Sequence, residues 1–318
     1  MRRVAELFND VGRIIKRAWW PILGISLLLW FGWLALTVVA VLSLFDLGRL
    51  TSAITTLFDV FERYPNGDLP RSVQNELGDA FTDVVRTENP VPYIVVGVLI
   101  VALSLLVSSI QIAAVSRLGM DAAAGQPVSW RAGWGSGFTG GFRLFGYFVA
   151  WTAIVSAVIA AMVLLGAALG ALSVALAVVM ITLIALALAV VSVWITGRLI
   201  PIIVQVDVAP GALRWTWNAT RDRFWAVLGR YLLWSIVASV IAQIVLTIVM
   251  LPFSLVTVAA AATPGPATIA WVTGLYALTI PLSMALTALT MIGVVPIWRD
   301  LTDDPTYRSI TADGHVVK

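Results

Sequence analysis

Long apolar runs without Asp, Glu, Lys or Arg alternate along this chain with short basic segments rich in tryptophan. About 20 apolar residues are enough to cross the hydrocarbon core of a bilayer as a helix. The run 144–197 is uncharged over 54 residues. A straight helix of that length would measure about 80 Å, so this run must fold back, and 166–170 is the plausible bend. The residues 263–266 divide the last uncharged run in the same way. The pattern predicts an all-α bundle of six spans, at about 20–45, 91–116, 144–166, 170–197, 231–258 and 267–298.

Amphipathic basic segments precede the odd-numbered spans. In 4–19, Leu7, Val11 and Ile14 are spaced to share one face of a helix whose other face is charged. A cationic helix of this kind lies in the headgroup plane, although a surface helix of a soluble domain shows the same pattern. The segments 129–143 and 210–230 repeat the composition. We therefore expect one domain, 1–299, built from three tandem units of an interfacial helix and a hairpin, followed by a tail, 300–318.

Charge distribution predicts the orientation. Of the 20 Lys and Arg residues, 16 lie in the basic segments or near the termini, and four lie in the polar segment 46–90, which also carries eight acidic residues. The positive-inside rule then places both termini in the cytoplasm and 46–90 outside, in a bacterial cytoplasmic membrane. We interpret 46–90 as two short helices around a turn at 65–68. Its carboxylates suit acid–base or metal chemistry, but the charged faces of amphipathic helices account for them as well.

Composition excludes several kinds of site. The chain is 60% hydrophobic and 12% charged, whereas soluble domains carry roughly 25% charge. It has no cysteine, which excludes disulfides and thiolate sites, and its one histidine, His315, lies in the polar tail. The glycine-rich run 133–141 lacks the preceding strand that a phosphate cradle requires. We expect no cofactor and no metal, and no nucleic acid, because the arginines and aromatics of 210–230 lie on opposite faces.

Tryptophan favours the headgroup level, and each arginine near an anionic leaflet contributes about 1 kcal/mol to membrane binding. We therefore expect anionic headgroups on the cytoplasmic side as partners, together with an unidentified membrane protein. The candidate contact residues are the arginines and tryptophans that lie in the basic segments or near predicted span ends: Arg13, Arg17, Trp19, Arg117, Trp130, Trp134, Arg198, Arg214, Trp217, Arg221, Arg223, Arg230 and Arg299.

The segment 212–217, ALRWTW, leads through Arg223-Phe224-Trp225 and Leu228-Gly229 into the fifth span. With six spans in three hairpins, it resembles the membrane domain of bacterial glycerophosphoryl diester phosphodiesterases. The chain is similar to stand-alone, actinobacterial-type members without the catalytic domain. The resemblance implies a fold and an association with lipid or envelope. It implies no activity, because a chain whose one histidine is His315 lacks the residues of that enzyme's site.

Two functions fit these observations. A non-enzymatic scaffold or lipid-contacting protein needs no ionisable group inside the spans, and the most polar residues there are Gln111 and Gln243. A transporter or permease subunit for an uncharged or apolar substrate is the alternative. It would use backbone exposed near Gly166, Pro252 and Pro281. We favour the first, and we do not expect an enzyme.

Overall fold

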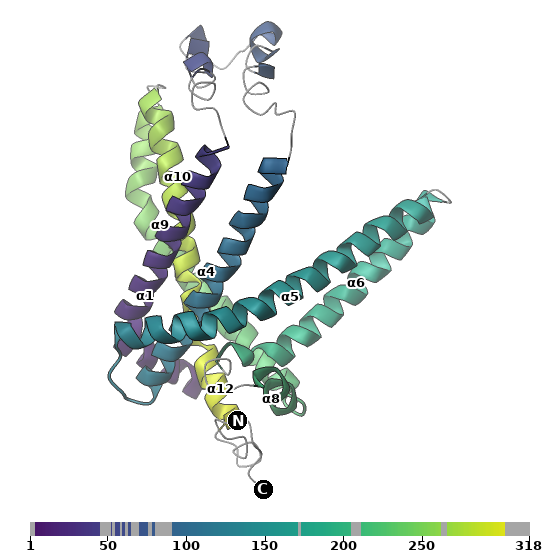
Figure 1. Ribbon diagram of the computed structural model, residues 1–318. Helices are drawn as coiled ribbons and strands as arrows, with labels where there is room; N and C mark the ends of the chain where they lie inside the picture. Colours follow the sequence, from purple (N-terminus) through teal and green to yellow (C-terminus); the bar gives the residue numbers. More distant parts are fainter. Residues whose placement is uncertain are drawn as a thin grey trace. The chain divides into compact units, whose positions relative to one another are not determined.

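The computed structural model describes residues 4–44, 91–170, 173–204, 211–261 and 266–302, with scattered positions between 52 and 79. The regular elements in the five long ranges are all helices, and six candidate spans among the described residues are long and apolar enough to cross a membrane (Figure 1). The two helices predicted in 46–90 lie mostly outside the described residues, as does most of the tail. The helices are α1 (Val4–Leu42), α4 (Val91–Ala123), α5 (Trp130–Gly170), α6 (Val174–Leu199), α8 (Ala212–Ala219), α9 (Phe224–Ala261), α10 (Pro266–Leu286), α11 (Ala288–Ile292) and α12 (Val294–Thr302).

The chain divides into two compact units, and several helices contribute to both. The first unit comprises Met1–Ser26, Leu105–Ser239 and Thr287–Lys318, and the second comprises Leu27–Ser104 and Val240–Leu286. The first unit thus gathers the start of α1, the end of α4, the start of α9, and all of α5, α6, α8, α11 and α12. It contains every described Lys and Arg outside 46–90.

The separate interfacial helix expected at 4–19 is the beginning of α1, which continues through Pro21 without a break. Its apolar face is buried in protein rather than facing lipid: Val11 and Ile14 are at most 1% exposed. The apolar partners come from distant parts of the chain, because a Cβ at Gly119 of α4 would contact both Ile14 and Val295 of α12. An amphipathic pattern defines an apolar face but does not say whether protein or lipid covers it.

The glycine-rich run 133–141 is a packing face. A Cβ at Gly141 would lie 2.7 Å from the Cα of Ile110 in α4, and one at Gly137 would lie 3.1 Å from the Cβ of Ala114. Small residues spaced four apart let two helix backbones approach closely. The segment expected at 129–143 is therefore not a separate element. It forms the first turns of α5, which is continuous from Trp130 to Gly170.

The helices α5 and α6 run side by side as a hairpin (Figure 1). The first ends at Gly170 and the second begins at Val174, close to the bend predicted at 166–170. A Cβ at Gly166 would lie 2.7 Å from the Cδ1 of Ile181, so the helices touch at this point. Most other side chains on the hairpin are exposed, including Val163 and Leu186, as is usual for helix surfaces that face lipid.

The sixth predicted span, 267–298, is covered by α10, α11 and α12, and one candidate span among the described residues runs from Leu278 to Thr302. The breaks fall at Thr287 and Gly293, between α10 and α11 and between α11 and α12. The indole of Trp234 lies where a Cβ at Gly293 would be, and its Nε1 donates a 2.9 Å hydrogen bond to the Leu289 carbonyl. Packing of the α9 tryptophan against the backbone thus holds this irregular segment.

The second unit contains the part of α1 from Leu27 on, the part of α4 up to Ser104, the part of α9 from Val240 on, and all of α10. Trp30 is 3% exposed and lies edge-on to Trp33, with the ring centroids 5.4 Å apart. Pro252 and Pro281 lie inside α9 and α10 and do not end those helices. Prolines are tolerated within membrane helices because neighbouring groups satisfy the freed carbonyls.

Candidate functional site

The single helix predicted over 210–230 is broken between α8 and α9. Thr220 closes α8: its N–H donates to the Thr216 carbonyl at 3.1 Å, and its Oγ1 lies 2.8 Å from the same oxygen. The buried hydroxyl also lies 3.3 Å from the Arg198 carbonyl at the end of α6. A threonine side chain that competes for backbone carbonyls favours a helix end. The break turns Arg221 and Arg223 out of the helix and towards the end of α6.

Arg198 lies in the last turn of α6 inside an aromatic cage. Its guanidinium carbon is 5.4 Å from the ring centroid of Trp194, 5.4 Å from that of Trp217, and 5.9 Å from that of Phe224. Each cation–π contact contributes about 0.5–2 kcal/mol, depending on how far it is shielded from water. Gly197 makes the cage possible, because a Cβ there would meet the Phe224 ring.

The cage fixes the guanidinium and leaves hydrogen-bonding capacity unused. Arg198 Nη1 donates a long 3.4 Å bond to the Trp217 carbonyl. Its Nε is buried and has no hydrogen-bond partner among the described residues. An unsatisfied buried donor costs about 1–3 kcal/mol, so this side chain is better suited to holding an acceptor than to stabilising the fold.

Beside the cage is an open cleft of about 610 Å³, which we call the arginine cleft. Arg198, Arg221 and Arg223 line it with one acid, Asp222; its other lining residues are Trp194, Phe224, Trp225 and Ala226. Three positive groups against one negative group make the lining cationic. Guanidinium groups present planar pairs of donors that match phosphate and carboxylate oxygens. The arrangement is suited to binding an anion.

A second open cleft of about 420 Å³, the apolar cleft, adjoins the first across Trp194. It is lined by Trp194, Ile195, Leu199, Leu213, Arg214, Trp217 and Asn218, and its surface is almost wholly apolar. Trp194 and Trp217 meet edge-on, with ring centroids 5.0 Å apart. Trp194 lines both clefts, whereas Trp217 lines the apolar cleft, and the Arg198 guanidinium lies over both rings.

Other predicted contact arginines have partners within the protein. Arg17 Nη1 donates to the Ala122 carbonyl at 3.3 Å, and Arg299 Nη1 donates to the Ala123 carbonyl at 3.1 Å. Both acceptors are in the last turn of α4, where carbonyls have no partner within the helix and cations are favoured by the helix dipole. These arginines cap α4 and tie it to α1 and α12.

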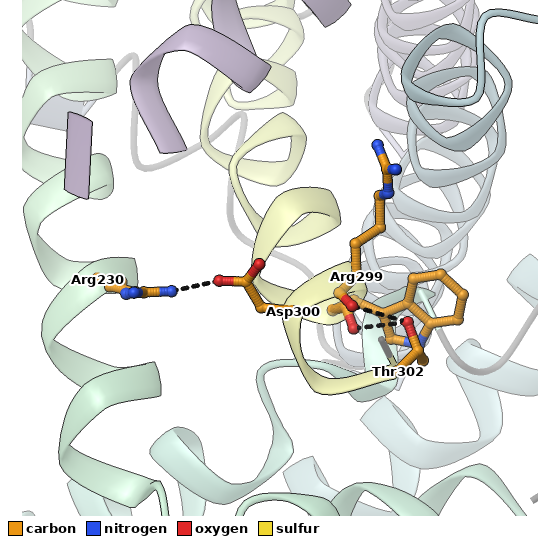
Figure 2. A network of polar contacts seen from close by, with 5 residues as sticks. Arg230, Arg299, Asp300 and Thr302 are labelled. Carbon is orange, nitrogen blue, oxygen red and sulfur yellow. Dashed lines mark hydrogen bonds and ion pairs between the residues drawn. The ribbon is translucent and has the colours of Figure 1, made fainter. Parts of the chain in front are cut away.

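Arg230 and Asp300 form an ion pair that is largely shielded from solvent. The Arg230 side chain is 11% exposed and that of Asp300 5%, and their closest atoms are 2.5 Å apart. Figure 2 shows Arg230 on α9 reaching to Asp300 on α12, while Arg299 points away from the pair. Both residues lie just outside the spans predicted at 231–258 and 267–298. The pair joins the start of α9 to α12.

The remaining predicted contact residues do not join the arginine cleft. Arg13 pairs with Asp10 at 3.6 Å, and Arg117 pairs with Asp121 at 3.3 Å. Trp130 packs over Gly24, and Trp134 stacks on Phe138 with the ring centroids 5.7 Å apart. The others lie at surfaces: Trp19 is exposed beside Trp20, and Arg214 and Trp217 line the apolar cleft.

Sequence reasoning missed Trp194, Phe224, Asp222 and Asp300. Trp194 could have been found from the sequence. It lies four residues before Arg198 on one helix, and side chains at this spacing are neighbours. Phe224 and Asp222 depend on the break at Thr220, and Asp300 depends on packing of α12 against α9. No local pattern points to those three contacts.

The second unit has a smaller open cleft of about 310 Å³. Gln243, Thr247, Ser254 and Thr279 provide its polar side chains, and the rest of the lining is Leu246, Met250 and Leu251. It lies near Pro252 and Pro281, where the transport hypothesis expects exposed polar groups. Its uncharged lining has no electrostatic attraction for an ion, so the arginine cleft is the stronger candidate site.

Comparisons with known proteins give no relative: no family model, no curated protein and no solved structure matches the chain. Within the described residues, no group of three or more His, Cys, Asp or Glu side chains lies close enough to hold a metal ion. The site is therefore interpreted from its own geometry.

Some arginines, such as Arg230, bond to other parts of the protein, whereas others, such as Arg221, line the arginine cleft. The effect of their replacement on the free energy of unfolding should distinguish the two groups. Arg230→Met removes the ion pair with the buried Asp300 carboxylate, which should destabilise the protein by about 1.5–3 kcal/mol. Arg221→Met, at an exposed position, should change stability by no more than about 0.5 kcal/mol. Thermal unfolding in detergent, followed by tryptophan fluorescence, measures both. Equal melting temperatures for the two variants would contradict a structural role for the pair.

Proposed function

We propose that this chain is a non-enzymatic integral membrane protein that binds anionic lipid headgroups and acts as a lipid-contacting scaffold. The observation that carries the proposal is the arginine cleft, which is lined by Arg198 near the end of α6 and by Arg221 and Arg223 in the α8–α9 turn. The first unit also contains the basic segments on which the sequence-based expectation depends. Partners beyond lipid stay unassigned.

The charges support an anionic ligand over a neutral one. The guanidinium of Arg198 is held by three rings and lies in the lining of the arginine cleft. Two more arginines line the same cleft, and each is expected to add about 1 kcal/mol of attraction near an anionic membrane surface. A headgroup phosphate supplies several oxygens to such donors, so it is the ligand that best fits this lining.

The resemblance to the membrane domain of glycerophosphoryl diester phosphodiesterases agrees with a lipid-associated role. It rests on the arginine- and tryptophan-rich lead into the fifth span, ALRWTW at 212–217 and Arg223-Phe224-Trp225. We infer a relative of that domain, located in the bacterial cytoplasmic membrane. The resemblance concerns only the membrane-embedded part of those proteins, so we propose no catalytic activity from it.

The double variant Arg221→Gln/Arg223→Gln tests lipid binding. Loss of two cleft charges should reduce retention of anionic phospholipid on the purified protein by roughly 30-fold, at about 1 kcal/mol for each arginine. Lipid extracted from the detergent-purified protein and quantified by mass spectrometry measures the effect.

The matched control is Arg131→Gln/Arg143→Gln, which removes the same charge from exposed positions of α5 outside the cleft. It should keep most of the lipid. Equal losses in both double variants would indicate general charge attraction instead of a site, and no loss in the cleft variant would refute the proposed function.

The proposed orientation places the basic segments and both termini in the cytoplasm. Reporter domains fused after Arg117 and after Arg198 should be active on the cytoplasmic side, and one fused at Gly67 should be active outside, following the positive-inside rule. Two reporter enzymes, one active only in the cytoplasm and one active only outside it, show on which side of the membrane each fusion point lies. The reversed pattern would place the arginine cleft at the other leaflet and remove the basis for the assignment.

A further inference from the structure

We propose that the arginine cleft and the apolar cleft together bind one phospholipid, with its phosphate in the first and an acyl chain in the second. This inference rests on the proposed function, which concerns the headgroup, and adds a binding place for the acyl chain. The two clefts share Trp194, which contacts Trp217 of the apolar cleft edge-on. Their chemistry differs in the way that the two ends of a phospholipid differ.

The headgroup side is defined by charge. Arg198, Arg221 and Arg223 face one acid, Asp222, so the lining keeps an excess of positive charge. The cage of Trp194, Trp217 and Phe224 holds the Arg198 guanidinium in place before a ligand arrives. A pre-positioned guanidinium loses little side-chain entropy on binding, which favours affinity for a phosphate.

The chain side is defined by apolar surface. Ile195 and Leu199 of α6 face Leu213 of α8 across a cleft of about 420 Å³. Leu213 is 44% exposed, and Trp217 beside it is 37% exposed, so the cleft is accessible without any movement of the fold. Burying each methylene of a chain there contributes about 0.8 kcal/mol, which makes chain length a test of the cleft.

A soluble phosphate and a lipid phosphate share the headgroup chemistry, and the apolar cleft distinguishes them. Inorganic phosphate would use the arginine cleft alone. A phospholipid would use both clefts, and its affinity should depend on its chains. The adjoining clefts therefore favour the lipid as the occupant.

The test compares phosphatidic acid with two oleoyl chains, phosphatidic acid with two hexanoyl chains, and inorganic phosphate. Binding to the full chain is measured by native mass spectrometry at one fixed detergent concentration. The wild-type protein should bind the long-chain lipid at least tenfold more tightly than the short-chain lipid. Inorganic phosphate should compete weakly with the long-chain lipid.

Leu213→Gln should remove that tenfold preference while leaving short-chain binding within about twofold, because a polar side chain then faces the acyl chain. Leu232→Gln is the matched control. Leu232 is similarly exposed, at 49%, and lines neither cleft, so the preference should persist in this variant. Both variants alter exposed positions, and an unchanged melting temperature confirms folding.

The outcomes separate the two proposals. If Arg221→Gln/Arg223→Gln loses both lipids but Leu213→Gln keeps the chain-length preference, headgroup binding stands and the two-cleft inference is wrong. If the arginine variant loses neither lipid, the proposed function itself is wrong. If inorganic phosphate displaces the long-chain lipid at equal concentration, the site binds soluble anions and the inference is also overturned.

Discussion

The structure depends on one constraint: a guanidinium group at the edge of an apolar helix bundle must find an acceptor or an aromatic face. Charged groups are costly to remove from water unless they are paired or hydrogen-bonded. Arg17 and Arg299 meet this requirement at carbonyls in the last turn of α4, and Arg230 meets it at Asp300. These contacts join α1, α4, α9 and α12, so the arginines at the span ends help to assemble the first unit. Glycines complete the packing, because Gly137 and Gly141 bring α5 close to the backbone of α4.

Arg198 satisfies the same constraint in another way. Three aromatic rings surround it, and Arg221 and Arg223 join it around a cleft that has one acid. The break at Thr220 produces this arrangement, since a continuous helix over 210–230 would carry Arg221 and Arg223 along its surface. A short polar turn therefore places Arg221 and Arg223 in the lining of the arginine cleft. The arginines thus fall into two groups, those that join helices of the first unit and those that line the arginine cleft.

Hydropathy predicted the coarse architecture because uncharged runs of sufficient length have few alternatives to membrane-spanning helices. It also predicted the bend between α5 and α6, where the chain exceeds the thickness of a bilayer. It did not predict that the start of α1 and the glycine-rich start of α5 would continue into their spans, or that single residues, Thr287 and Gly293, would interrupt the helix of the sixth span. The amphipathic face with Val11 and Ile14 was visible, but its protein partners on α4 and α12 come from distant sequence.

Of the site, Arg198, Trp217, Arg221 and Arg223 were predicted from composition alone. Trp194 had a usable signal in its spacing from Arg198, whereas Phe224, Asp222 and Asp300 depend on tertiary packing.

The most direct measurement of this division of the arginines is a cryo-electron microscopy map of the protein in nanodiscs made from its own membrane lipids. The account predicts an elongated non-protein density, with its phosphate within hydrogen-bonding distance of the Arg198, Arg221 and Arg223 guanidinium groups and its chain beside Leu199 and Leu213. It also predicts that Arg17, Arg230 and Arg299 bond only to protein atoms. A map in which a protein carboxylate pairs with Arg198, or in which the lipid phosphates gather at Arg230 and Arg299 instead, would contradict the account.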